Sequence, residues 1–124
     1  MNLIDKHIII RTTRAIKCLY LNSNFYNEVK LYGLSAETIF HEKELYISDT
    51  NLKIKNKESI ENSFLWLIKI GVLRREVDGQ GLTSKVRLTP LGRSILEKTP
   101  DLANQYPSIS ESIRNWISRK LLMA

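Results

Sequence analysis

The sequence predicts a mainly α-helical fold with one small β-hairpin, and three observations lead to this fold class. First, apolar residues recur at helical spacing along most of the chain. Second, Asn, Ser and Thr residues that can cap helices precede several of these segments. Third, two short runs rich in β-branched residues, 72–78 and 84–89, flank a loop that contains Gly79 and Gly81. We therefore expect several packed helices and a single hairpin.

The length and composition predict one domain. With 124 residues, of which 43% are hydrophobic, the chain is expected to fold as a single unit over residues 1–124, with its core at about 23–98. No segment approaches the roughly 18 unbroken apolar residues of a membrane span, and Met1 to Asp5 lacks the basic segment of a signal peptide. We expect a soluble, cytoplasmic protein with no membrane partner.

The first half of the chain predicts three helices. An amphipathic stripe predicts a helix from about Leu3 to Tyr20, and its members are Ile8, Thr12, Ala15, Ile16 and Leu19. Asn22 or Ser23 can cap a second helix that runs through Tyr32. Ser35 can cap a third, from Ala36 to about Leu45. The polar stretch 46–55 then predicts a loop.

The second half predicts a helix, the hairpin and two further helices. Asn56 can cap a helix that ends at Gly71, and its buried stripe would be Ile60, Phe64, Leu67 and Ile68. Thr89 can cap the next helix, with Pro90 at its first position. A capping box of Ser108 and Glu111 predicts the C-terminal helix at about 108–122.

The alternation of apolar and charged residues along the hairpin predicts one buried face and one solvent-exposed face. Val86 and Leu88 share one face of the second strand, and Lys85 and Arg87 share the other. On the first strand Arg75 is in phase with two apolar residues. Arg75 therefore either lies at the edge of the hairpin or marks a break in its register.

The charge of the chain is positive and unevenly distributed. The formal net charge is +6 and the sequence pI is near 9.6, which favours a polyanionic partner such as nucleic acid. Residues 53–93 hold nine basic and four acidic side chains, whereas residues 33–52 have a net charge of minus three. The basic segment contains the predicted hairpin.

The run FLWLIKIGVLRREVDGQGLTSKVRLTPLGRSIL, residues 64–96, resembles the second half of a winged helix-turn-helix domain of the MarR or PadR type. The residues that carry this resemblance are Gly71, Leu88, Thr89, Pro90, Gly92 and Arg93. It implies a winged helix-turn-helix fold with added N- and C-terminal helices, and a DNA-binding transcriptional regulator. The hairpin of this fold is called the wing. The run also resembles small, uncharacterised cyanobacterial proteins that share the sequence of the wing.

The resemblance and the charge together suggest residues that contact double-stranded DNA. A helix fits the major groove, and a basic hairpin beside it reaches phosphate or the minor groove. Expected phosphate contacts are Arg74, Lys85 and Arg87 on the wing and Lys53, Lys55 and Lys57 before the helix. Expected base contacts are Gln80 at the hairpin tip and Ser59 and Asn62, with Lys69, on the helix. The alternative is that the basic hairpin and the three lysines are only a solvated surface.

Two features depart from the family pattern. The stretch from Tyr46 to Lys55 replaces the tight turn of a helix-turn-helix. Glu58 and Glu61 lie near the start of the candidate recognition helix, where they would repel phosphate. A second hypothesis is therefore a winged-helix module that binds another protein and no specific DNA.

The C-terminal helix suggests a homodimer. Ile113, Trp116 and Ile117 offer more apolar surface than a terminal helix of a small domain can easily bury alone. Trp66 and Trp116 are expected to be anchors in the core or in an interface, since base stacking by them would be unusual. We therefore expect the terminal helices to form the contact between two copies.

The sequence gives no indication of catalysis or of a cofactor. Cys18 is a lone cysteine, and His7 and His41 are the two histidines, so neither a disulfide nor a zinc site with spaced ligands is expected. The chain has no phosphate-binding Gly-x-x-x-x-Gly-Lys, no Gly-x-Ser-x-Gly turn and no carboxylate pair placed beside a histidine. We expect a binding protein without enzymatic activity, cofactor or metal.

Overall fold

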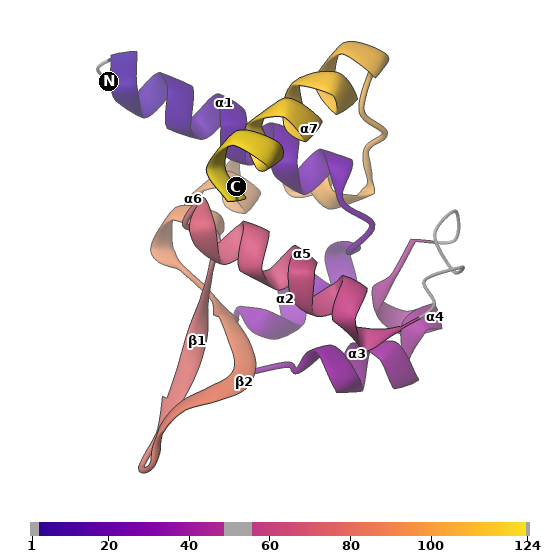
Figure 1. Ribbon diagram of the computed structural model, residues 1–124, viewed down its shortest axis with the longest axis vertical. Helices are drawn as coiled ribbons and strands as arrows, with labels where there is room; N and C mark the ends of the chain where they lie inside the picture. Colours follow the sequence, from indigo (N-terminus) through magenta and orange to yellow (C-terminus); the bar gives the residue numbers. More distant parts are fainter. Residues whose placement is uncertain (1–2, 49–55, 124) are drawn as a thin grey trace.

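The computed structural model describes residues 3–48 and 56–123 and confirms a mainly helical fold with one antiparallel hairpin (Figure 1). In chain order the elements are α1 (Leu3–Cys18), α2 (Ser23–Val29), α3 (Ala36–His41), α4 (Lys43–Tyr46), α5 (Lys57–Lys69), β1 (Leu73–Asp78), β2 (Gly81–Leu88), α6 (Pro90–Lys98), the one-turn helix η2 (Leu102–Asn104) and α7 (Ile109–Met123). Helix α5 crosses the middle of the molecule, with α1 and α7 above it in this view and the hairpin and α3 below.

The predicted caps begin the helices as expected. The side chains of Asn22, Ser35, Asn56 and Thr89 each accept a hydrogen bond from the backbone N–H three residues further on. Such bonds satisfy N–H groups that the first turn of a helix leaves without a partner. The capping box before α7 also forms, because Ser108 N donates to Glu111 Oε1 over 2.9 Å and Glu111 N donates to Ser108 Oγ over 3.1 Å.

The core lies around α5. Phe64, Trp66 and Leu67 are fully buried, and the ring of Phe64 stacks on that of Phe25 in α2 with a centroid distance of 5.9 Å. Ile68, predicted as part of the buried stripe, is partly buried and packs against the core. Helix α5 therefore links the helices above it to those below.

The structure corrects three predicted boundaries. The helix expected over 36–45 is two short helices that meet at Glu42, whose φ of −119° and ψ of 45° are not helical. Helix α2 ends at Val29, and turns lead from there to Leu34. Strand β2 begins at Gly81, whose φ of 114° suits glycine.

A β-bulge explains the position of Arg75. The pairing of β1 with β2 shifts between Arg75 and Val77, so the strict alternation ends there and Val77 is exposed. Arg75 instead donates to the carbonyl of Ser84 over 2.9 Å and pairs with Glu61 of α5. Arg75 was expected either to lie at the edge of the hairpin or to mark a break in its register, and the structure shows the break.

The hairpin is attached to the helices through Leu34. The backbone of this residue forms an isolated antiparallel bridge with Val86 of β2. Leu34 lies between α2 and α3, so it adds a one-residue edge to the sheet. The bridge was not predicted from the sequence.

The terminal helices α1 and α7 pack against each other and run in opposite directions. Lys17 Nζ lies 2.8 Å from Glu111 Oε2, and Arg14 Nη2 donates to Ser118 Oγ over 3.1 Å. Helix α1 also packs inward through its predicted stripe, since Thr12, Ala15 and Ile16 are fully buried. Among the helices that the structure describes, none has the length and apolar character to cross a membrane.

Candidate nucleic-acid interface

The residues of the Leu-Thr-Pro-x-Gly-Arg motif join the hairpin to the helices. The Thr89 hydroxyl lies within hydrogen-bond distance of the carbonyls of Gly71 and Val72 and accepts the N–H of Gly92 over 3.1 Å. A Cβ on Gly92 would lie 2.7 Å from the Val72 carbonyl oxygen. The motif therefore needs a glycine here so that the first turn of α6 can pack on the residue that precedes β1.

Two arginines hold the end of α2. Arg87 Nη2 and Arg93 Nη2 both donate to the carbonyl of Lys30, over 3.4 and 3.3 Å, and Arg87 Nε donates to the carbonyl of Val29 over 3.3 Å. The last carbonyls of a helix lack intrahelical partners and carry partial negative charge, so guanidinium groups suit them. Arg87 Nη1 also lies 3.5 Å from Glu76 Oε1. These bonds tie both β2 and α6 to α2.

The structure thus places Arg87, a predicted phosphate contact, in a half-buried position with partners inside the protein. Phosphate contact by its guanidinium stays a prediction, and it would compete with these bonds. Arg74 and Lys85 differ from it, because both are exposed and neither forms an ion pair among the described residues. They are the free cations of the wing.

The wing tip is exposed and partly apolar. Gln80 is exposed, and its backbone N–H donates to Asp78 Oδ1 over 2.7 Å, which forms the turn. Val77 and Leu82 lie opposite each other in the hairpin, and Leu82 is 76% exposed. In Figure 1 the hairpin extends away from the helices, so its tip can reach a partner that the helices do not touch.

Beyond the first turn, the exposed residues of α5 continue one helical stripe from Glu58, which includes Asn62, Leu65 and Lys69. The predicted contact Asn62 and the accompanying Lys69 therefore face solvent together. Ser59, also predicted, is exposed, but its hydroxyl and backbone N–H both bond to the capping Asn56. Lys57 is exposed at the first position of the helix. Lys53 and Lys55 lie outside the described residues.

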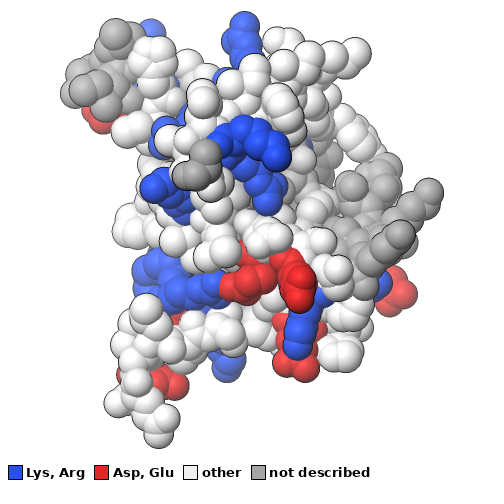
Figure 2. All heavy atoms as spheres, in the orientation of Figure 1, with Lys and Arg blue, Asp and Glu red and all other residues white. Residues whose placement is uncertain are grey.

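Acidic groups gather where α3, α5 and the wing meet. A cavity of about 270 Å³ lies there, and its lining residues are Ser35, Ala36, Glu37, Lys57, Glu58, Glu61 and Ser84. Figure 2 shows a small group of acidic side chains in the middle of this view, with basic side chains on several sides of it. Arg75 neutralises Glu61. Among the described residues Glu37 forms an ion pair with His41, with 3.9 Å between Oε1 and Nε2.

The predicted dimer residues lie on α7, a helix with no buried residue. Ile113, Trp116 and Ile117 are 54%, 61% and 45% exposed. Ile109 and Leu121 extend the same face and are more exposed still. The outer side of α7 is therefore a continuous apolar strip, for which the structure contains no covering element among the described residues.

Sequence reasoning missed the contacts that hold the wing in place. The partners of Arg87 in these bonds are 57 and 58 residues away, and the partner of Arg93 is 63 residues away. No local pattern marks such pairs. The motif that contains Arg93 was recognised, but through resemblance and not through its contacts.

The order of elements defines a mainly helical fold with one small hairpin. Helix α2, the one-residue bridge at Leu34, the helices α3, α4 and α5 and then the hairpin follow one another, with α1, α6, η2 and α7 around them. A family model described as Npun_F0494-like matches residues 3–119, and the chain belongs to this family. No curated protein and no solved structure shows a significant match to the chain. The likeness to MarR and PadR proteins rests on residues 64–96 and stays a prediction.

Proposed function

We propose that this protein is a transcriptional regulator that binds double-stranded DNA as a homodimer. One observation carries the proposal: a wing that packs next to α5 has two exposed cations, Arg74 and Lys85, that form no ion pair among the described residues, and α5 itself exposes Asn62 and Lys69. A helix in the major groove with a basic hairpin on the adjacent backbone is an established way to bind duplex DNA. Such a regulator would act in the cytoplasm.

The wing supplies phosphate contacts in this proposal. Arg74 and Lys85 donate to phosphate oxygens, and Gln80 at the tip reaches a base edge. Asn62 and Lys69 approach the major groove from α5. Glu58 limits the approach at the other end of the stripe, so the wing contributes more to affinity than the helix does.

The homodimer is supported by the uncovered apolar face of α7. A second copy would bury Ile113, Trp116 and Ile117 against the same residues, as a two-fold interface requires. This face also lies away from the wing tip, which is at the opposite end of the molecule from the start of α1, the helix that packs with α7 (Figure 1). Two wings would then contact two half-sites of one duplex.

The test is binding to a mixed-sequence DNA duplex measured over a range of salt concentrations. Affinity is expected to fall steeply with salt, and the slope should decrease by about 2 when Arg74 and Lys85 are both changed to alanine. The matched control is Lys6→Ala, which removes an exposed lysine from α1 and should leave the slope unchanged. Binding without salt dependence, or no binding to any duplex, would refute the proposal.

A second candidate function is a winged-helix module that docks a protein. The acidic cavity favours it, because the carboxylates of Glu37 and Glu58 lie where DNA would approach, whereas that of Glu61 is paired with Arg75. A pull-down with and without nuclease separates the two candidates. A protein partner retained after the nucleic acid is destroyed, together with loss of that partner in Glu58→Gln, would favour protein docking.

A further inference from the structure

A cavity of about 250 Å³ lies between α2 and α6, away from the wing tip and the exposed stripe of α5. Its lining residues are Ser23, Tyr26, Asn27, Lys30, Leu96, Glu97, Pro100 and Ala103. The cavity is smaller than the roughly 300–1,000 Å³ of sites for drug-sized ligands. A ligand for it must therefore be small.

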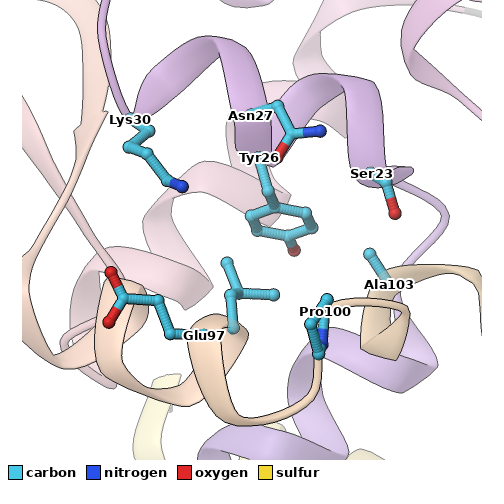
Figure 3. Close-up of a pocket in the computed structure, with 8 residues that line it drawn as sticks. Ser23, Tyr26, Asn27, Lys30, Glu97, Pro100 and Ala103 are labelled. Carbon is cyan, nitrogen blue, oxygen red and sulfur yellow. The ribbon is translucent and has the colours of Figure 1, made fainter.

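Two side chains of opposite charge, Lys30 and Glu97, lie at one end of the cavity. The Lys30 ammonium extends from the end of α2, and the Glu97 carboxylate lies below it on α6 (Figure 3). The two side chains do not form an ion pair with each other within 4.0 Å, nor with another described residue. A ligand with one anionic and one cationic group can satisfy both at once.

The rest of the cavity is suited to an apolar group. Leu96, Pro100 and Ala103 line it beside the ring of Tyr26. Ser23 lies at the end opposite Glu97, so polar residues stand at the rim and apolar ones in between (Figure 3). This is the usual distribution in pockets for small molecules.

The hydroxyl of Tyr26 has no hydrogen-bond partner among the residues that the structure describes. Tyr26 is 2% exposed, and its hydroxyl points from α2 toward α6 without a hydrogen bond (Figure 3). A buried hydroxyl without a partner costs free energy. An oxygen of a bound carboxylate would supply the missing acceptor.

From this arrangement we infer that the cavity binds a small α-amino acid with an apolar side chain. The ligand carboxylate accepts from the Lys30 ammonium and the Tyr26 hydroxyl, and the ligand ammonium donates to Glu97. The apolar side chain of the ligand packs against Leu96 and Pro100. Both charges of the ligand contribute, since the half-buried Lys30 ammonium and the exposed Glu97 carboxylate each gain a partner of opposite charge.

The cavity is connected to the wing through Lys30. The carbonyl of this residue accepts from Arg87 of β2 and from Arg93 of α6. A ligand that immobilises Lys30 therefore acts on the residue whose carbonyl is bonded to both β2 and α6. If the proposed DNA-binding function is correct, on which this step rests, the ligand changes the affinity for DNA.

The test is isothermal titration of the full chain with L-leucine and L-phenylalanine. We expect binding of at least one of them, and loss of at least about tenfold in affinity in Lys30→Met and in Glu97→Gln. Tyr26→Phe should bind severalfold more weakly while unfolding no more easily than the parent. The control is Lys98→Met, which changes an exposed lysine next to Glu97 that does not line the cavity.

Two leucine analogues test the need for both charges. Isocaproate lacks the amine and isoamylamine lacks the carboxylate, and neither should bind as well as leucine. The inference is overturned if neither amino acid binds at millimolar concentration, if either analogue binds equally well, or if the Lys30 and Glu97 variants bind like the control. Because titration uses protein without DNA, its result is independent of the proposed function.

Discussion

The backbones of Leu34 and Val86 exchange two hydrogen bonds, with N–O distances of 3.3 and 2.9 Å. This pair is the direct link between the hairpin and the segment that enters α3. A Cβ on the preceding residue, Gly33, would lie 3.0 Å from Cβ of Lys85 and closer still to the Glu76 carboxylate. The base of the wing is therefore paired edge to edge with this segment, which fixes the direction of the wing relative to α5.

Substitution of Gly92 by alanine is expected to destabilise the fold by about 1–3 kcal/mol. The added methyl group would lie 2.7 Å from the Val72 carbonyl oxygen and 2.8 Å from Leu88 Cδ1, so α6 must move. Denaturant unfolding measures the change. Ser94→Ala, at an exposed position of the same helix, should alter the unfolding free energy little, and an equally stable Gly92→Ala would show that α6 does not pack as described.

Arg87 and Arg74 should differ in what their loss affects. Arg87→Ala removes hydrogen bonds to the carbonyls of Val29 and Lys30, so we expect a loss of about 1–3 kcal/mol in the free energy of unfolding. Arg74→Ala removes an exposed side chain without an ion pair and should leave stability within about 0.5 kcal/mol. Thermal unfolding of the two variants checks this, and equal melting temperatures would contradict it.

The contact between α1 and α7 should weaken in acid. The hydrogen bond from Lys17, and then that from the backbone of Ser108, hold the pKa of Glu111 below its usual range. Because the folded pKa is the lower one, the stabilisation is complete above the unfolded pKa and is lost as pH falls through the folded value. Protection factors from amide hydrogen exchange, which remove the effect of pH on the intrinsic exchange rate, should fall in α7 between neutral pH and pH 3.

The matched variant for the acid effect is Glu111→Gln. It should show faster exchange in α7 already at neutral pH and a smaller further change on acidification. If the variant and the parent respond to acid in the same way, another carboxylate is responsible.

Replacement of Ile113 and Trp116 by alanine should abolish the proposed dimer while leaving the fold intact. Both side chains are more than half exposed in the single chain, so their loss leaves no cavity in the core. Sedimentation velocity over a range of concentrations gives the mass of each species. Leu45→Ala, which trims an exposed leucine of α4, is the control, and a parent protein that remains monomeric at high concentration would exclude the dimer.

Local sequence signals predicted most of the secondary structure. The capping residues and Gly71, with its φ of 88°, act within a few residues of their own position, so a short window of sequence contains the whole cause. The same holds for the capping box of Ser108 and Glu111. The predicted hairpin follows from β-branched runs and glycines in the same way.

The parts that sequence reasoning missed depend on distant partners. The bulge after Arg75 forms where this side chain turns toward Glu61 on α5, and the break at Glu42 lies where α4 packs near α2. The candidate interface shows the same limit: charge and resemblance named Arg74, Lys85 and Arg87 together, and only the packing separates Arg87 from the other two. The cavity beside Lys30 had no sequence signal, since its lining comes from residues more than 60 positions apart.

The pairing of Lys17 with Glu111 has a consequence for how the chain acquires its structure. The two residues are 94 positions apart, which corresponds to about 5–19 s of synthesis on a ribosome at about 5–20 residues per second. During that interval α1 is already made while the helix that covers its outer side does not yet exist. The inward face of α1 can join the core before α7 is made, and the side of α1 that α7 later covers stays exposed to other nascent chains until then.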